Sequence, residues 1–321
     1  MPGSAKPPLS SRPIELRTNR ISYVIAGGTL LPRLLGEEDQ ATTGNPPSQA
    51  WIASTVTSAL GEGTEGLSCV AETGAFLKDL LDGDPGSFLG TEHSATWGSN
   101  PGYLIKLLNS RDRLLVQVHP DKARARAHFG SEFGKTEAWY VVAAESGALV
   151  HAGFKLGVTK ELLREVILAE DSDRILGLLH AFPVVPGDLL FIPAGLPHAL
   201  GKDSLILEIQ EPTDITLRAE RRRPSGEILP ESYLHAGRGM EVLLDCFDYD
   251  GADFSATRAR VFLAPGGRAE AGQERVLVSY DTTPCFAMSA ITLASTTRLE
   301  KRNPRFAVAV VLSGSGLIVG D

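Results

Sequence analysis

Four side chains that commonly bind divalent metal ions stand in three separated parts of the sequence. Gln117 and His119 occur in the run Gln-Val-His-Pro-Asp, Glu137 follows Gly-Lys-Thr, and His198 ends the run Pro-Ala-Gly-Leu-Pro-His. Carboxylate, amide and imidazole ligands suit zinc and, less selectively, iron, manganese or nickel. With one ionised carboxylate among neutral ligands, a divalent ion keeps a formal charge of about +1 and acts as a Lewis acid.

The elements around these residues predict how the side chains would meet. Alternate side chains of a strand share a face, so Gln117 and His119 point one way while the valine between them packs on the core. Glu137 begins a second strand-like run. In residues 187–198, a glycine turn, a buried strand, a proline and a second glycine redirect the chain so that His198 faces inward.

Short β-like runs between turn signals predict an all-β sandwich or barrel as the core. These runs are residues 21–25, 114–119, 139–142, 189–192 and 204–209. Three helices are expected as insertions around the core, at residues 73–81, 160–169 and 174–180. Further β-like runs are expected from Met240 onward, at residues 259–263, 275–280, 286–293 and 306–312.

Three parts are expected along the chain. Residues 1–13 are rich in proline and serine and predict a flexible N-terminal arm. Residues 14–235 are predicted to form the metal-bearing domain with its helical insertions. Residues 236–321 are predicted to form a smaller β domain that is truncated, because the sequence stops where a barrel would continue.

Several blocks of the sequence resemble known families. The segment 187–198 resembles the second motif of the cupin superfamily, with glycine, proline, glycine and histidine at that motif's spacing. Residues 104–121, 134–140 and 192–218 are similar to the type I mannose-6-phosphate isomerase family. This resemblance implies a mainly β fold: a cupin barrel (a double-stranded β-helix or jelly roll) with helical insertions, followed by the smaller cupin-like β domain.

The resemblance also implies an activity and a ligand set. In that family a glutamine, two histidines and a glutamate hold zinc, and they match Gln117, His119, Glu137 and His198, which implies one zinc ion per chain. The family's active-site arginine matches Arg218. The implied activity is a metal-dependent aldose–ketose isomerase that interconverts mannose 6-phosphate and fructose 6-phosphate through an enediolate.

Three further residues are candidates for binding or chemistry. Glu208 matches the family's acidic residue and follows the His198 turn, so it is either a proton-transfer base or a structural partner of a core cation. Lys106 and Lys135 are candidates for anchoring the phosphate. Leu115 stands where many relatives carry a serine, which removes one hydroxyl from the expected substrate contacts.

Two other functions stay open at this point. One is a cupin dioxygenase with iron at the same ligands, because one fold hosts many chemistries. The other is a non-catalytic cupin that binds sugar phosphate, although the joint presence of Lys106, Lys135, Glu208 and Arg218 argues against it.

Composition narrows the class of protein. The 321 residues carry a net charge of −8 and are 43% hydrophobic, which is typical of a globular protein and argues against nucleic-acid binding. The run Arg221-Arg222-Arg223 is interpreted as solvated surface. Three scattered cysteines without pairing motifs fit a reducing compartment, and no apolar stretch is long enough to span a membrane, so a soluble cytoplasmic enzyme acting on a small molecule is expected. The oligomeric state stays open.

Overall fold

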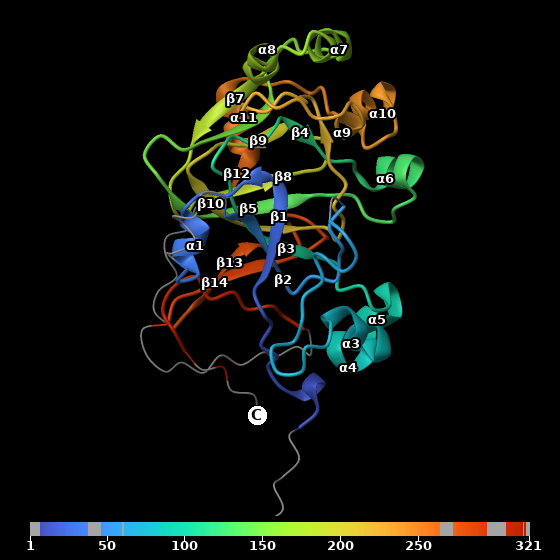
Figure 1. Ribbon diagram of the computed structural model, residues 1–321, viewed down its shortest axis with the longest axis vertical. Coiled ribbons are helices and arrows are strands. Elements are labelled where there is room, and N and C mark those ends of the chain that lie inside the picture. The colour runs from blue at the N-terminus through green and yellow to red at the C-terminus, as the bar shows by residue number, and fades with distance from the viewer. Residues whose placement is uncertain are drawn as a thin grey trace, which may run out of the picture.

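Two antiparallel sheets form the centre of the fold (Figure 1). The computed structural model describes residues 7–37, 46–59, 61–263, 272–293, 306–316 and 318, apart from the side chains of residues 22–25. The larger sheet has seven strands, in the order β1 (Asn19–Ala26), β2 (Pro47–Ile52), β3 (Leu104–Asn109), β10 (Ser204–Gln210), β5 (Glu137–Ala144), β8 (Leu189–Ile192) and β12 (Phe262–Leu263). The smaller sheet has five, in the order β11 (Leu217–Arg218), β4 (Gln117–Val118), β9 (His198–Leu200), β6 (Leu149–Phe154) and β7 (Leu179–Pro183). The prediction of a mainly β protein is confirmed.

The helices lie outside the two sheets, and a small hairpin sheet is added near the C-terminus (Figure 1). The hairpin consists of β13 (Glu274–Val278) and β14 (Met288–Ile291). The helices are η1 (Leu9–Ser11), α1 (Leu30–Leu34), α3 (Leu77–Gly83), α4 (Pro85–Leu89), α5 (Thr91–Trp97), α6 (Lys122–Phe129), α7 (Lys160–Leu168), α8 (Ser172–Gly177), α9 (Ser232–His235), α10 (Met240–Asp245) and α11 (Phe254–Val261).

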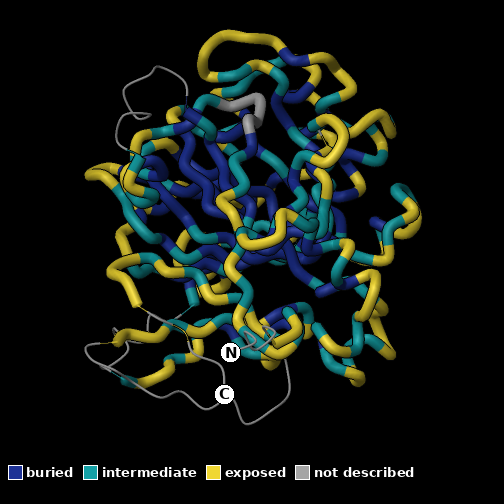
Figure 2. The backbone as a smooth tube through the Cα atoms, turned by 60° about the horizontal axis from the view of Figure 1, so that its bottom comes forward, coloured by how far each residue is buried: buried dark blue, intermediate teal, exposed yellow. Residues whose placement is uncertain are grey.

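Alternation along the strands decides which side chains lie between the sheets. On β8, Leu190 packs in a cluster shared by both sheets, whereas its neighbour Leu189 packs in the cluster on the outer face of the larger sheet. The shared cluster joins Trp139 of β5 to Phe182 of β7 and Leu200 of β9. The two sheets therefore form a sandwich, and Figure 2 shows the buried chain running through its middle with exposed segments around it.

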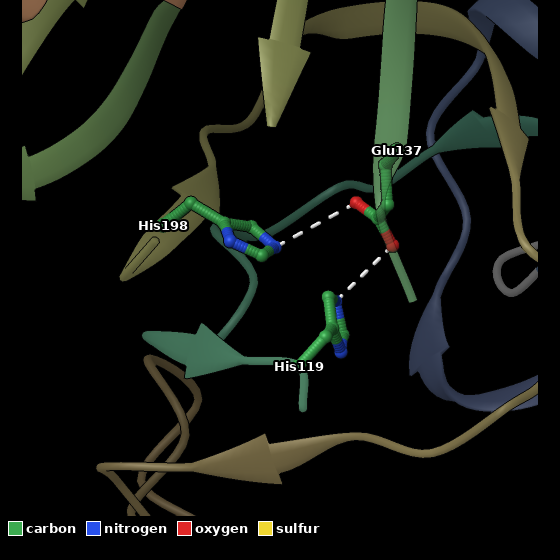
Figure 3. Close-up of side chains that lie close together, drawn as sticks. All are labelled: His119, Glu137 and His198. Carbon is green, nitrogen blue, oxygen red and sulfur yellow. Dashed lines mark ion pairs between the residues drawn. The ribbon is translucent and has the colours of Figure 1, made fainter. Parts of the chain in front are cut away.

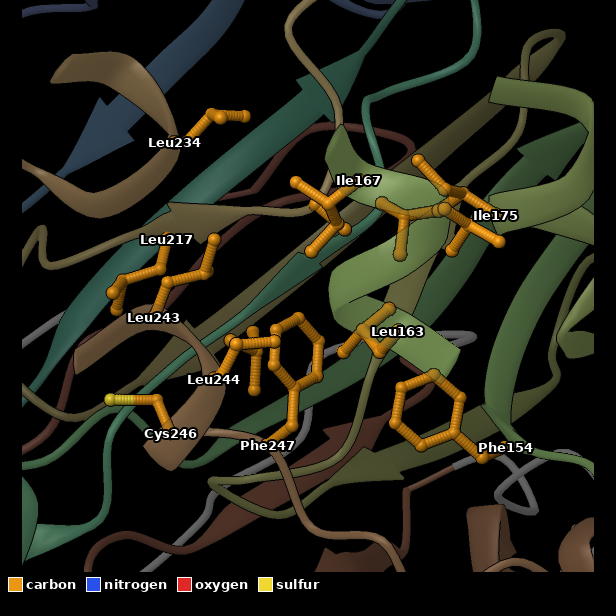
Figure 4. Packing of buried hydrophobic residues seen from close by; sticks show 14 of the residues in the cluster. Phe154, Leu163, Ile167, Ile175, Leu217, Leu234, Leu243, Leu244, Cys246 and Phe247 are labelled. Carbon is orange, nitrogen blue, oxygen red and sulfur yellow. The ribbon is translucent and has the colours of Figure 1, made fainter. Parts of the chain in front are cut away.

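Helices cover the outer face of the smaller sheet (Figure 4). The apolar side of α7 was predicted from its periodicity, and Leu163 and Ile167 pack there against Phe154, Leu217 and helix α10. Each such fully buried aliphatic side chain contributes roughly 1.5–3 kcal/mol relative to an exposed one. This layer holds the smaller sheet in place from behind.

Two predicted helices have different ends in the structure. The cap of α7 is as predicted, since Thr159 accepts a hydrogen bond from the N–H of Leu162. Helix α8 ends at Gly177, because the next residues leave the helix to pair with β6 as strand β7. Helix α3 starts at Leu77 rather than residue 73, since Gly74 has a φ of +73° that no helix accommodates.

The expected strand at residues 114–119 is only two residues long, as β4. From Met240 the prediction of β structure is wrong for two segments, which are helices α10 and α11. Asp253 caps α11 by accepting from the N–H of Ala256, and the helix ends directly before β12, which pairs with β8 of the larger sheet. Residues 306–312 form no strand but pack against the outer cluster of the larger sheet through Phe306 and two valines.

The structure describes only part of the predicted N-terminal arm. Residues 1–6 of the predicted arm lie outside the described residues, and residues 7–13 contain the short helix η1. The domain boundary after residue 235 stays a prediction. All three cysteines are free, as expected. No helix within the described ranges has the length and hydropathy of a membrane span.

Candidate metal centre and active-site cavity

The register of the larger sheet places polar side chains of three neighbouring strands in one line. Lys106 on β3 is directly opposite Glu208 on β10, and Glu208 is directly opposite Trp139 on β5. Directly opposed residues share a face of the sheet, and this face is turned toward the smaller sheet. All three are buried, and we call them the lysine–glutamate row.

The smaller sheet presents a second line of side chains. Arg218 on β11 is directly opposite Gln117 on β4, which in turn is directly opposite His198 on β9. Their strand neighbours Leu217, Val118 and Ala199 pack in the cluster beneath the helices, so the line itself faces inward. We call these residues the arginine–histidine row, and it faces the lysine–glutamate row across the sandwich.

The predicted metal ligands meet where the arginine–histidine row faces the larger sheet. Figure 3 shows the side chains of His119, Glu137 and His198 pointing toward one another. Nε2 of His119 lies 3.1 Å from one carboxylate oxygen of Glu137, and Nε2 of His198 lies 3.7 Å from the other. One ligand atom from each residue lies within 4.8 Å of the other two. The side-chain nitrogen of Gln117 is 3.1 Å from Nε2 of His198. Ligand atoms around a tetrahedral zinc ion with bonds of about 2.1 Å are separated by roughly 3.4 Å, so these spacings fit.

The hydrogen bonds of His119 and His198 leave the Nε2 atom of each ring available to a metal ion. Nδ1 of His119 contacts the carbonyl of Ile215 and Nδ1 of His198 contacts the carbonyl of Leu196, each at 2.9 Å. A donor proton on each Nδ1 leaves the Nε2 lone pair free for a cation. Burial, and then the charge of Lys135, lowers the pKa of His119 to about 3, and burial also lowers the pKa of His198. Both imidazoles are therefore neutral at neutral pH, as ligands must be.

Two buried atoms of this cluster have no hydrogen-bond partner among the residues that the structure describes. They are Nε2 of His119 and Oε1 of Glu137, which face each other at 3.1 Å. Burial alone raises the pKa of Glu137, but its neighbour His119 and the cation Lys135 hold it well below its ordinary value. A neutral imidazole nitrogen and a carboxylate oxygen are both acceptors, so the pair is stabilised by a cation between them. The residues present fit a divalent metal ion.

Loop geometry connects the two ligand-bearing turns. Gly195 has a φ of +88°, which suits glycine, and its N–H donates to the carbonyl of His119 at 2.8 Å. On the other side, a side chain at Gly134 would meet the carbonyl oxygen of Pro120 at 2.8 Å. These close approaches fix His198 and Glu137 relative to His119.

Cations and carboxylates alternate beside the metal ligands. Nζ of Lys135 is 3.3 Å from Glu137, and Nζ of Lys106 is 3.4 Å from Glu208 and 3.5 Å from Asp214. Burial, and then the charge of Glu137, raises the pKa of Glu208 to about 7. A carboxyl group that titrates near neutral pH is suited to moving protons.

A cavity of about 320 Å³ adjoins the metal cluster. Gln117, Lys135 and Trp139 line it, and each also contacts a metal-ligand residue. Arg218 forms part of the wall, where it donates to the carbonyls of Thr216 and Tyr233. The remaining polar lining residues include Lys106, Arg111, Asp112, Arg113, Glu208, Asp214, Arg223 and Ser225.

Similarity to known proteins is strongest with one group of enzymes. A mannose-6-phosphate isomerase from Streptococcus mutans serotype c (strain ATCC 700610 / UA159) is 35% identical over 246 residues, which are 74% of this chain and 71% of that protein. The chain belongs to the mannose-6-phosphate isomerase family.

Solved structures of mannose-6-phosphate isomerases share the fold. The structure from Bacillus subtilis is 25% identical with a TM-score of 0.57, covering 84% of this chain and 74% of that one. A mannose 6-phosphate isomerase bound with zinc and yttrium has a TM-score of 0.56 at 16% identity, covering 84% of this chain and 86% of that one. No family model matches the chain.

All eight residues expected to form a mannose-6-phosphate isomerase site lie at the metal cluster or on the wall of the cavity. His119, Glu137 and His198 form the cluster, and the other five line the cavity. These five are Lys106, Gln117, Lys135, Glu208 and Arg218. The serine expected in many relatives of this family is replaced by Leu115, which is buried in the cavity wall.

Sequence reasoning missed several residues of the site. Trp139, for which no role in the site was predicted, is buried in the shared cluster, and its indole N–H also donates to both Glu137 at 3.1 Å and Glu208 at 3.0 Å. Its position two residues after Glu137, on the same strand face, was the available signal. The interpretation of Arg221-Arg222-Arg223 as solvated surface is wrong for Arg223, which lines the cavity with only 14% of its side chain exposed, whereas Arg222 is exposed and Arg221 forms a partly exposed ion pair with Glu170.

A buried ion pair also escaped prediction. Glu220, whose side chain has no exposed area, accepts two hydrogen bonds from Arg113, at 2.7 and 2.9 Å. Glu220 also accepts the backbone N–H of Val116 at 2.6 Å. Since Glu220 follows Arg218 and Val116 precedes Gln117, this carboxylate ties β11 to β4 and so aligns the arginine–histidine row.

Proposed function

We propose that this chain interconverts mannose 6-phosphate and fructose 6-phosphate, with zinc as the metal. One observation carries the proposal: in a member of this family, a metal-ligand cluster and a carboxyl group with a pKa near neutrality adjoin one cavity. An aldose–ketose isomerase must move a proton between C1 and C2 and stabilise an enediolate. The two facing rows supply groups for both tasks.

The proton transfer is assigned to Glu208. Its carboxylate removes the proton at one carbon and returns it at the neighbouring carbon, while Lys106 at 3.4 Å and the Trp139 N–H at 3.0 Å steady its charge. Lys106 and Lys135 bind sugar oxygens at this buried end. Arg218, on the opposite wall, neutralises charge that develops on the enediolate oxygens with its fixed set of donors. When bound, a divalent cation supplies Lewis-acid stabilisation of those oxygens.

Charge in the cavity favours an anionic substrate. Six cationic and three acidic side chains line it, whereas the whole chain carries a net charge of −8. An excess of positive charge inside a negative protein attracts and retains a dianion such as a sugar phosphate. Arg113 contributes less than its formal charge, because Glu220 neutralises it.

Zinc is proposed as the ion, at one per chain, held by Gln117, His119, Glu137 and His198. The ligand types, the neutral histidines and the spacing of the ligand atoms support this choice. One structural neighbour is named as bound with zinc and yttrium. We further propose that the sandwich is a cupin barrel and that residues 236–321 include a smaller cupin-like β domain. The expected cytoplasmic location stays a prediction.

A coupled assay with mannose 6-phosphate tests the proposal. Turnover is expected in the zinc-loaded protein, with loss on chelation and recovery on addition of zinc. Absence of turnover in protein shown to contain one zinc per chain would overturn the assignment. Recovery with iron together with oxygen consumption would indicate a dioxygenase, and tight binding of sugar phosphate without turnover would indicate a binding protein.

Arg218→Ala separates the roles within the site. We expect kcat to fall by roughly 100-fold or more, since a donor that stabilises transition-state charge contributes on that order. Bound zinc should stay at one per chain, because Arg218 is not among the proposed ligands. Near-normal turnover in this variant would remove Arg218 from the mechanism.

A further inference from the structure

Two arginines reach the cavity from loops outside the metal centre. Arg111 follows β3, and its backbone N–H donates to the carbonyl of Ala26 at 3.0 Å. Arg223 lies in a short hairpin over residues 221–229, in which its N–H donates to the carbonyl of Glu227 at 2.8 Å. Both arginines line the cavity, where Arg111 is itself exposed and Arg223 is followed by the exposed lining residues Pro224 and Ser225, so they mark its mouth.

The side chain of Arg223 is turned into the cavity. Only 14% of it is exposed, although the tip of the hairpin, residues 224–227, is exposed to solvent. Nη1 of Arg223 is held at 2.8 Å by Glu227, whose own side chain is 55% exposed. The carboxylate therefore holds one nitrogen of the guanidinium, which has further N–H donors for a ligand in the cavity that it lines. Ser225 at the hairpin tip also lines the cavity and adds a hydroxyl.

The lysines at the inner end are poorly placed for a dianion. A phosphate within reach of Lys106 would lie close to Glu208 and Asp214, which approach its Nζ at 3.4 and 3.5 Å. Lys135 likewise lies 3.3 Å from Glu137. Like charges at such short range repel strongly in a buried site. The buried end therefore suits neutral hydroxyl and carbonyl oxygens.

We propose that the phosphate group of the substrate binds at the mouth of the cavity, between Arg111 and Arg223, with Ser225 as a third donor. This inference rests on the proposed isomerase function and determines which end of the sugar enters first. The reacting carbons then reach the lysine–glutamate row, and Lys106 and Lys135 contact sugar oxygens rather than the phosphate. The guanidinium forks of the two arginines match phosphate geometry.

Arg111→Gln and Arg223→Gln test the site, with Arg222→Gln as the matched control. Arg222 is next to Arg223 on the same hairpin, is exposed, and contacts Glu170 instead of the cavity. Each of the first two variants should raise the KM for mannose 6-phosphate by roughly 10- to 100-fold with kcat within about threefold of wild type, the range expected for losing one charge-assisted contact. Inorganic phosphate should inhibit wild type competitively and inhibit both variants correspondingly less.

Four outcomes separate this inference from the proposed function. If wild type turns over and both variants keep its KM and its inhibition by phosphate, the mouth site is wrong and the isomerase assignment stands. If wild type does not turn over but calorimetry shows phosphate binding that both variants lose, the mouth site stands and the isomerase assignment fails. If neither turnover nor phosphate binding occurs, both fail. If a glutamine variant is unfolded by circular dichroism, Arg111→Lys or Arg223→Lys replaces it, and an unchanged KM in the folded lysine variant and in Ser225→Ala would overturn the site.

Discussion

The two rows that face each other across the sandwich are built in different ways. The lysine–glutamate row lies on strands of six, seven and eight residues, whose ladders fix the register. The arginine–histidine row lies on strands of two, two and three residues. So few ladder bonds leave its alignment to contacts outside the sheet, namely Glu220 with Val116 and Gly195 with His119. The first row is positioned by secondary structure and the second by loops.

This difference predicts that the arginine–histidine row is the easier one to break. Two of its members, Gln117 and His198, are also proposed metal ligands, whereas the lysine–glutamate row holds the proposed acid/base. Substitutions in the two rows should therefore have separable effects on zinc content and on turnover.

The largest effect is expected for His198→Asn, which removes a metal ligand. Loss of one ligand together with its aligned Nε2 should reduce bound zinc to well below one per chain and turnover by more than roughly 1000-fold. Metal analysis and the coupled assay measure both. His151→Asn is the matched control, since His151 lies on the neighbouring strand β6 outside the cluster and should keep zinc and activity. A His198 variant with a full complement of zinc would contradict the ligand assignment.

The next effect is expected for Glu208→Gln, in the other row. It keeps the shape and removes the proton acceptor, so kcat should fall by roughly 100- to 10,000-fold while zinc stays bound. Glu145→Gln, at an exposed position just after β5, serves as the control. Loss of zinc together with activity in the Glu208 variant would show that the two rows do not act separately.

The pH dependence of stability should have opposite signs for the two sides of the site. In metal-free protein, His119 is held neutral by a pKa of about 3 against an ordinary value of 6.5. Its contribution is fully present above pH 6.5 and is lost as the pH falls, by roughly 2 kcal/mol between pH 7 and pH 5. Glu208, with its pKa raised to about 7, contributes stability at low pH that is lost as the pH rises through 7.

Urea unfolding in the presence of a chelator measures both contributions. The free energy of unfolding of wild type minus that of His119→Asn should decrease from pH 7 to pH 5. The free energy of unfolding of wild type minus that of Glu208→Gln should instead increase from pH 7 to pH 5. Parallel changes for the two variants would show that one of the two pKa shifts has the wrong sign.

The smallest effect is expected for Gly195→Ala, at the loop contact that aligns His198. A side chain at a φ of +88° costs roughly 1–2 kcal/mol of stability. Gly147→Ala provides the control, because Gly147 has the same φ of +88° but a Cβ there meets nothing within 4 Å. Both variants should lose similar thermal stability, and only Gly195→Ala should bind zinc more weakly. Equal zinc affinity in the two would mean that this turn does not position His198.

The long strands and the short strands also differ in how well the sequence predicted them. The long strands β5 and β10 and the helix α7 were predicted closely, because apolar periodicity sustained over seven or more residues is a clear signal. Strands of two residues carry no period, so β4 was overextended and β11 was not predicted. The helices after Met240 were mistaken for strands, since short apolar runs fit either period.

The residues of the site likewise fall into those that the sequence predicted and those that it did not. That His119, Glu137 and His198 lie together was predicted because these residue types are distinctive and the spacing around His198 resembles a known motif. Arg223 and Glu220 were not predicted, because an arginine in a short basic run and the glutamate just before that run look like surface in the sequence. Only the fold shows that Glu220 has no exposed side-chain area and that Arg223 turns inward.

Glu220 also lies next to the edge of the smaller sheet. Strand β11 is at the edge of the smaller sheet, and an open edge offers unpaired N–H and C=O groups to any passing chain. Here the strand stops after two residues, and the Glu220 carboxylate accepts the N–H of Val116, next to β4, which the short strand does not reach. The contact that aligns this edge of the sheet thus also pairs a backbone donor that the short strand leaves over.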